Sequence, residues 1–276
     1  MNLDLPFGEL ALLAGALLCG GFLTGILSGL FGVGGGGILV PVLYEAFGFI
    51  GTPDDVRMHL AVGTSFAVIA PTSFRAAYAH FRRDSIDMGL LRLMAPAALV
   101  GIVAGAIVAR IADGSAFQFI WVISAALLSA SILFRPSDWR FKGDLASPAY
   151  YVPIGSGVGF IATLMGVGGG AQIAATLALF GRPMHQAVGT ASGFSALLAL
   201  PALTGFIWAG WDAPNLPAGS VGYFSLIGAA AIIPASVLAA PLGARLAHGL
   251  PRRKLEIAFA LFLLLVGIRF LFALSY

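Results

Sequence analysis

The chain has 276 residues, of which 59% are hydrophobic and only 10% are charged. Soluble globular proteins are about 45–50% apolar and about 25% charged. This composition nearly excludes a soluble enzyme, a disordered protein and a nucleic-acid-binding module. The net charge of +3 rests on so few charges that we interpret it as a signal of membrane topology. Glycine is also in excess, with 37 residues.

Apolar runs follow one another along the whole chain. A transmembrane helix needs about 20 mainly apolar residues, and eight runs meet or approach that length. They are Leu10–Leu30, Leu60–Ala79, Gly89–Ala109, Phe117–Phe134, Tyr151–Met165, Ala187–Ala209, Tyr223–Ala247 and Leu255–Ala273. Two further runs, Ile38–Gly48 and Ala171–Phe180, are too short for an upright span, and each directly follows a glycine cluster.

The two halves of the sequence resemble each other. FGVGGG at residues 31–36 returns as MGVGGG at 165–170, and MHLAVGT at 58–64 returns as MHQAVGT at 184–190. Two matches in the same order indicate a duplication, which is frequent in secondary transporters. We therefore expect one transmembrane repeat over residues 1–134, a polar cytoplasmic linker over 135–148 and a second transmembrane repeat over 149–276.

Basic residues predict the orientation of the helices. They cluster at Arg82 and Arg83, at 135–142 and at 252–254, and such clusters favour the cytoplasmic side. All three share one side if the short helix crosses the membrane, or if it forms a re-entrant pair with the long helix before it. Either solution gives each half an odd number of crossings. The sequence therefore predicts an all-α polytopic membrane protein of two inverted-topology repeats, each with about five helical segments, and both chain ends outside.

The glycine clusters are the first candidates for a substrate site. Loose backbone amides cannot face lipid, and the N-terminus of the helix that follows favours an anion. We therefore expect Gly34, Gly35 and Gly36 and their counterparts Gly168, Gly169 and Gly170 to line the site, with Gln172 beside them. The alternative is close helix packing, which we favour for the isolated glycines; these are Gly101, Gly105, Gly155 and Gly159.

The second repeated motif offers hydroxyl groups. Gly63, Thr64 and Ser65 in the first half, and Gly189 and Thr190 in the second, place hydroxyls beside a flexible residue early in a helix. Such groups can replace water around an oxyanion. Equally, a threonine can bond back to its own helix backbone and stabilise a kink.

Three ionisable residues complete the candidates. His59 and His185 occupy equivalent positions and are candidates for proton coupling, with an interfacial anchoring role as the alternative. Arg75 lies in an apolar run, where it could neutralise an anion or extend to the interface. The sequence shows no hydrolytic constellation and no metal-ligand cluster. We expect no enzymatic activity, no metal and no cofactor.

Four sequence motifs resemble those of a known family. GILSGLFGVGGG at residues 25–36, AVGTS at 61–65, AHFRRDSID at 79–87 and LPAG at 216–219 are similar to the TauE/SafE membrane transporters. The resemblance implies a secondary transporter that exports a small sulfur-containing anion, such as sulfite or an organosulfonate, from the bacterial inner membrane by alternating access. Its expected partners are the small anion and the lipid bilayer, and we expect no nucleic acid. The sequence does not distinguish a monomer from a homo-oligomer. A passive anion channel and a non-transporting membrane subunit are the alternatives.

Overall fold

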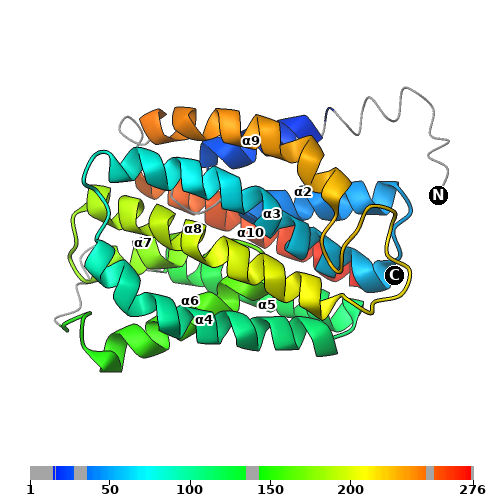
Figure 1. Ribbon diagram of the computed structural model, residues 1–276, viewed down its shortest axis with the longest axis horizontal. Helices are drawn as coiled ribbons and strands as arrows, with labels where there is room; N and C mark the ends of the chain where they lie inside the picture. Colours follow the sequence, from blue (N-terminus) through cyan, green and yellow to red (C-terminus); the bar gives the residue numbers. More distant parts are fainter. Residues whose placement is uncertain (1–14, 16, 28–35, 135–142, 247–251, 275–276) are drawn as a thin grey trace.

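The computed structural model describes residues 15, 17–27, 36–134, 143–246 and 252–274. Helices dominate these residues (Figure 1). A short helix, Leu17–Leu27, precedes the labelled helices. These are α2 (Gly36–Phe49), α3 (Asp54–Phe81), α4 (Met88–Ile111), α5 (Gly114–Leu133), α6 (Pro148–Met165), α7 (Gly170–Leu179), α8 (Met184–Ala209), α9 (Leu226–Leu246) and α10 (Arg252–Leu274).

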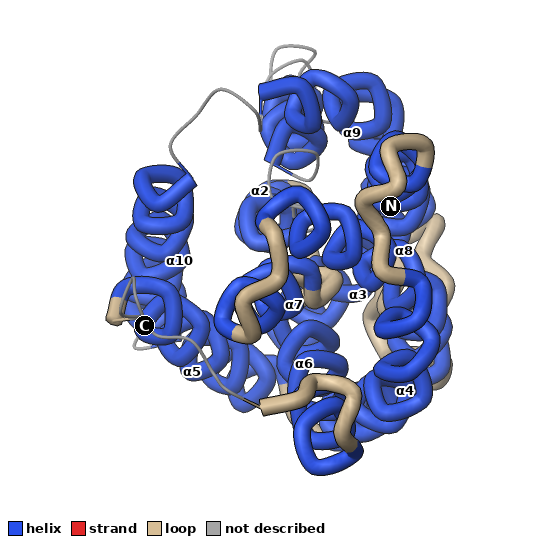
Figure 2. Tube along the Cα trace, turned by 90° about the vertical axis from the view of Figure 1, so that its left-hand side faces the viewer, coloured by secondary structure: helices blue, strands red, loops and turns tan. Residues whose placement is uncertain are grey.

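Six of the described helices are long and apolar enough to cross a membrane. They are α3, α4, α5, α8, α9 and α10, and they run along the long axis of the molecule (Figure 1). The predicted all-α polytopic membrane fold is thus confirmed. In Figure 2, α10 and α5 lie together on one side, while α2 and α7 lie nearer the middle.

Acidic side chains mark where several helices begin. The Asp87 carboxylate accepts a hydrogen bond from the Leu90 amide at 3.0 Å, and the Asp113 carboxylate accepts one from the Ala116 amide at 2.7 Å. These N-caps satisfy amides that have no acceptor within the helix. The start of α3 extends back to Asp54, earlier than its apolar run suggests, because acidic residues are favourable in the first turn of a helix.

The short helices form two hairpins. The rings of Tyr150, near the start of α6, and Phe180, directly after α7, lie 5.7 Å apart, so α7 returns toward the point where α6 begins. Its ten residues span about 15 Å, half of a bilayer core. Gly20 of the Leu17–Leu27 helix likewise lies against Val42 of α2. Both topologies that the charges allow return α7 to the side where α6 begins, and the short length of α7 favours the re-entrant one.

The two ends of the molecule differ in charge. The loop with Arg82 and Arg83 and the start of α10 lie at the same end, on the left in Figure 1. There the Arg253 guanidinium donates to the carbonyl oxygens of Ile132 and Leu133 at 2.6 and 3.0 Å, which joins α10 to the end of α5. We call this the basic end. The loop between α8 and α9 lies at the opposite end.

Isolated glycines allow the helices to approach closely. A Cβ on Gly101 would overlap the Ser156 carbonyl, and one on Gly159 would overlap the Ala98 carbonyl, so α4 and α6 pack backbone against backbone. Gly105 and Gly155 lie at the same contact. Small residues serve this purpose in membrane proteins. The packing role predicted for these four glycines is therefore confirmed.

Candidate functional site

The tip between α6 and α7 requires glycine. Gly166, Gly168 and Gly169 have φ angles of 69°, 71° and 75°, in the left-handed region that side chains disfavour. Gly166 ends α6 as a left-handed C-cap, and Gly169 is the N-cap of α7. The repeated MGVGGG sequence thus permits a tight reversal of the chain at the point where the hairpin turns.

Neighbouring elements anchor this tip. The Trp121 indole N–H donates to the Met165 carbonyl at 3.1 Å, and the Ser65 hydroxyl lies 3.0 Å from the Gly166 carbonyl oxygen. Gly36, the first residue of α2, packs directly against that same carbonyl, leaving no room for a Cβ. The second glycine cluster and the first turn of α2 therefore meet. A substrate contact of Gly36 stays a prediction. Gly34 and Gly35 lie outside the described residues.

The N-terminus of α7 is buried and has no side-chain cap. Gly168, Gly169 and Gly170 are buried, and Gly169 makes no side-chain capping bond. The first amides of an α-helix have no acceptor within the helix. Both polar atoms of the Gln172 side-chain amide are also buried without a hydrogen-bond partner. This arrangement of unused donors at the positive end of a helix is suited to an anion.

A hydroxyl that the sequence analysis missed lies beside this tip. The side chain of Ser195, on α8, borders Gly168 and is fully buried. When the two halves are aligned on their motifs, Ser195 stands where the first half has Ile69, which also borders Gly168. This difference between the repeats, a polar residue in place of an apolar one, is the sequence signal that could have identified Ser195.

The Gly-Thr pairs connect the two halves of the chain. The Thr64 hydroxyl oxygen accepts from the Ser225 amide at 2.9 Å, while Gly63 packs against the Tyr223 carbonyl. In the same way the Thr190 hydroxyl oxygen accepts from the Asp87 amide at 2.9 Å.

Gly189 completes the correspondence, because it packs against the Ser85 carbonyl. Each Gly-Thr pair thus contacts the segment that precedes α9 or α4, which belongs to the other half of the chain. We call these contacts the Thr64 clasp and the Thr190 clasp. They are consistent with inverted repeats. A substrate contact of Gly63, Thr64, Gly189 and Thr190 stays a prediction.

The two histidines have different surroundings. His59 is 1% exposed, and its ring stacks between Phe117 at 4.3 Å and Tyr223 at 4.6 Å between centroids. Neither ring nitrogen of His59 makes a hydrogen bond of normal geometry. His185 is exposed. Burial raises the pKa of Tyr223, which lies in the loop before α9.

Arg75 is the remaining ionisable candidate. It is exposed on α3, next to the exposed Phe74, as expected for a side chain that extends to the interface. Among the described residues, no group of three or more His, Cys, Asp or Glu side chains could hold a metal ion. The structure therefore brings together Gly36, Ser65, Gly168, Gly169, Gly170 and Gln172 from the predicted set.

Comparison with known proteins identifies the family. The model of the family described as "Sulfite exporter TauE/SafE" matches residues 17–270. The chain belongs to the TauE/SafE family. A "probable membrane transporter protein" of Haemophilus influenzae is 31% identical over 249 residues, covering 90% of this chain and 94% of that protein. A protein of the same description from Methanocaldococcus jannaschii is 30% identical over 253 residues, covering 88% and 86%.

The probable membrane transporter protein YunE of Bacillus subtilis is 25% identical over 273 residues, covering 91% of this chain and 95% of that protein. No solved structure matches the chain significantly. The TauE/SafE resemblance is confirmed, and the chain is a multi-pass membrane transporter of this family.

Proposed function

We propose that this TauE/SafE transporter exports a small sulfur-containing anion, sulfite or an organosulfonate, across a bacterial inner membrane. The family description supports the class of substrate. The observation that carries the proposal is the buried, uncapped start of α7, together with the unpartnered amide of Gln172. A carboxamide and free backbone amides donate hydrogen bonds to an oxyanion without adding a full positive charge, so release stays possible.

The same residues suit the tetrahedral oxygens of a sulfite or sulfonate group. In this proposal the first amides of α7 and the Gln172 side chain donate to the oxygens, while the Ser65 hydroxyl holds the Gly166 carbonyl and Ser195 borders Gly168 from α8. Because the Ser65 position holds Ala191 in the second half, the site is asymmetric. An asymmetric site suits an anion with one oxygenated and one apolar side.

Alternating access follows from the two clasps in this proposal. The tip glycines are buried and both clasps are closed, so the conformation described is occluded. Release of the Thr190 clasp would open the basic end, and release of the Thr64 clasp would open the other end. His59 lies next to the Thr64 clasp through its contact with Tyr223. It is our candidate for coupling to protons.

Ligand-dependent thermal stability of the purified protein tests the substrate. We expect sulfite or a short sulfonate to raise the melting temperature, and Gln172→Leu to abolish this shift. Gln186→Leu, which changes the same residue type near the start of α8, is the matched control and should keep it. If sulfur anions leave the melting temperature unchanged while another class of solute raises it, the substrate proposal is wrong.

Counterflow in proteoliposomes tests the mechanism. A carrier preloaded with unlabelled sulfite takes up labelled sulfite transiently above equilibrium, and the rate saturates. A passive channel instead conducts a current without exchange. Under our proposal Gln172→Leu lowers counterflow while Gln186→Leu does not. Current without counterflow would show that the protein is a channel and not a carrier.

A further inference from the structure

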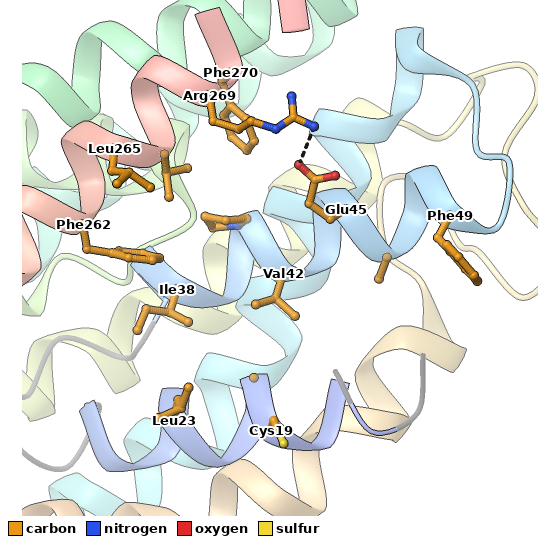
Figure 3. Close-up of a pocket in the computed structure, with 14 residues that line it drawn as sticks. Cys19, Leu23, Ile38, Val42, Glu45, Phe49, Phe262, Leu265, Arg269 and Phe270 are labelled. Carbon is orange, nitrogen blue, oxygen red and sulfur yellow. Dashed lines mark ion pairs between the residues drawn. The ribbon is translucent and has the colours of Figure 1, made fainter. Parts of the chain in front are cut away.

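An apolar groove lies on the side of the molecule. It has a volume of about 770 Å³ and is bordered by the Leu17–Leu27 helix, α2 and α10. Figure 3 shows Leu23 and Cys19 on one side, Ile38 and Val42 in the middle and Phe262 on the other side. Almost all of its lining is hydrocarbon.

One end of this groove carries an ion pair. The Arg269 guanidinium of α10 lies 3.3 Å from the Glu45 carboxylate of α2, and the two side chains are 58% and 53% exposed. Figure 3 shows Arg269 reaching across the groove toward Glu45. Because both groups are more than half exposed, each keeps hydrogen-bonding capacity for a further partner.

The depth of the groove matches one leaflet of a bilayer. Arg269 and Phe262 are two helical turns apart on α10, about 10 Å, and Ile38 to Phe49 on α2 covers about 16 Å. Half of a bilayer core is about 15 Å. The ion pair lies toward the end of α10 that is opposite the basic end, where a lipid headgroup would lie beside it. The apolar walls then follow the acyl region.

We propose that this groove binds one zwitterionic phospholipid whose headgroup carries a primary ammonium, as in phosphatidylethanolamine. Its phosphate would accept hydrogen bonds from Arg269, its ammonium would donate to Glu45, and one acyl chain would lie along α2 and α10. Paired acidic and basic side chains are complementary to such a headgroup, because guanidinium groups recognise phosphate and carboxylates accept from ammonium. An anionic lipid offers Glu45 no ammonium donor beyond Arg269, and a choline headgroup has no N–H to offer it.

Native mass spectrometry of the whole protein tests this proposal. The protein in mild detergent is mixed with equal amounts of phosphatidylethanolamine, phosphatidylcholine and phosphatidylglycerol that have identical acyl chains. We expect one phosphatidylethanolamine to remain bound per chain under activation that removes the other two. Glu45→Gln should reduce its preference over phosphatidylcholine about tenfold, and Arg269→Gln should weaken retention of all three lipids.

A steric variant shows where the lipid is bound. Leu265 lines the groove and is 67% exposed, so Leu265→Trp fills space without disturbing the core. We expect it to abolish lipid retention. Leu271→Trp, on the same helix and outside the groove lining, should retain the lipid as the wild type does.

Three results would overturn the proposal. One is equal retention of the three lipids by the wild type. Another is loss of lipid in both tryptophan variants. The third is a wild-type dimer that Leu265→Trp converts to a monomer, since a second copy of the chain would then be what occupies the groove.

Discussion

Replacing Gly36 by alanine tests whether the first turn of α2 meets the α6–α7 tip. A Cβ at this position would overlap the Gly166 carbonyl oxygen and crowd the Cα of Val167. Because the obstacle is backbone, no side-chain rotation relieves it. The two segments must separate by about 1.5 Å to restore ordinary van der Waals contact.

The contacts that hold the tip set the size of the effect. The tip is anchored by the Ser65 hydroxyl at Gly166 and by the Trp121 indole at Met165. Each of these buried hydrogen bonds contributes about 1 kcal/mol, and overpacking costs about 1–3 kcal/mol. The higher helix propensity of alanine offsets at most about 1 kcal/mol of this loss. We therefore expect Gly36→Ala to lower the free energy of unfolding by about 2 kcal/mol.

Unfolding by titration with a denaturing detergent, followed by circular dichroism, measures this difference. Gly157→Ala is the matched control, because a Cβ on Gly157 of α6 would meet nothing within 4 Å. Removing a glycine from a helix at an open position should stabilise the protein by up to about 1 kcal/mol. If Gly36→Ala is as stable as Gly157→Ala, the two segments do not meet as described.

Three further predictions concern the clasps, the basic end and the alkaline limit of stability. Thr64→Val leaves the buried Ser225 amide unpaired and Thr190→Val the partly buried Asp87 amide, so each should lower the free energy of unfolding by about 1–3 kcal/mol; an unchanged denaturant midpoint would contradict the clasp. Arg253→Ala removes the bonds to the end of α5 and should increase proteolysis there, whereas unchanged cleavage would count against this anchor. Because burial raises the pKa of Tyr223 above its ordinary 10.0, the unfolded chain loses that proton first, and stability should fall above about pH 10. Tyr223→Phe should reduce this fall in a melting-temperature profile, while Tyr78→Phe, at an exposed tyrosine, should not.

The sequence predicted most helices because apolar length determines which segments can span a bilayer. It was less informative at helix ends, where polar residues such as Asp54 extend α3 beyond its apolar run. It also left the path of α7 open. A crossing helix and a re-entrant helix satisfy the same charge pattern, and both return Phe180 toward Tyr150. The short length of α7 is what favours re-entry.

Local motifs indicated candidate residues but not the residues that these contact. The glycine cluster and Gln172 stood out because their types and spacing are unusual in an apolar chain. Nothing near Thr64 indicates that its hydroxyl accepts from Ser225, because that partner is specified by packing between distant helices. Ser195 was missed because a single serine in an apolar helix is ordinary, and it became informative only beside Gly168.

The clasps also constrain how the protein is made. Thr64 is separated from Ser225 by 161 positions, and a ribosome adds about 5–20 residues per second. After α3 emerges, the Thr64 hydroxyl therefore lacks its Ser225 partner for about 8–30 s. Thr190 meets Asp87 as soon as α8 emerges, because that partner has already been synthesised. During biogenesis α3, α4, α5 and α8 must stay in the bilayer with one contact incomplete, which makes this interval the point at which an insertion factor would be most useful.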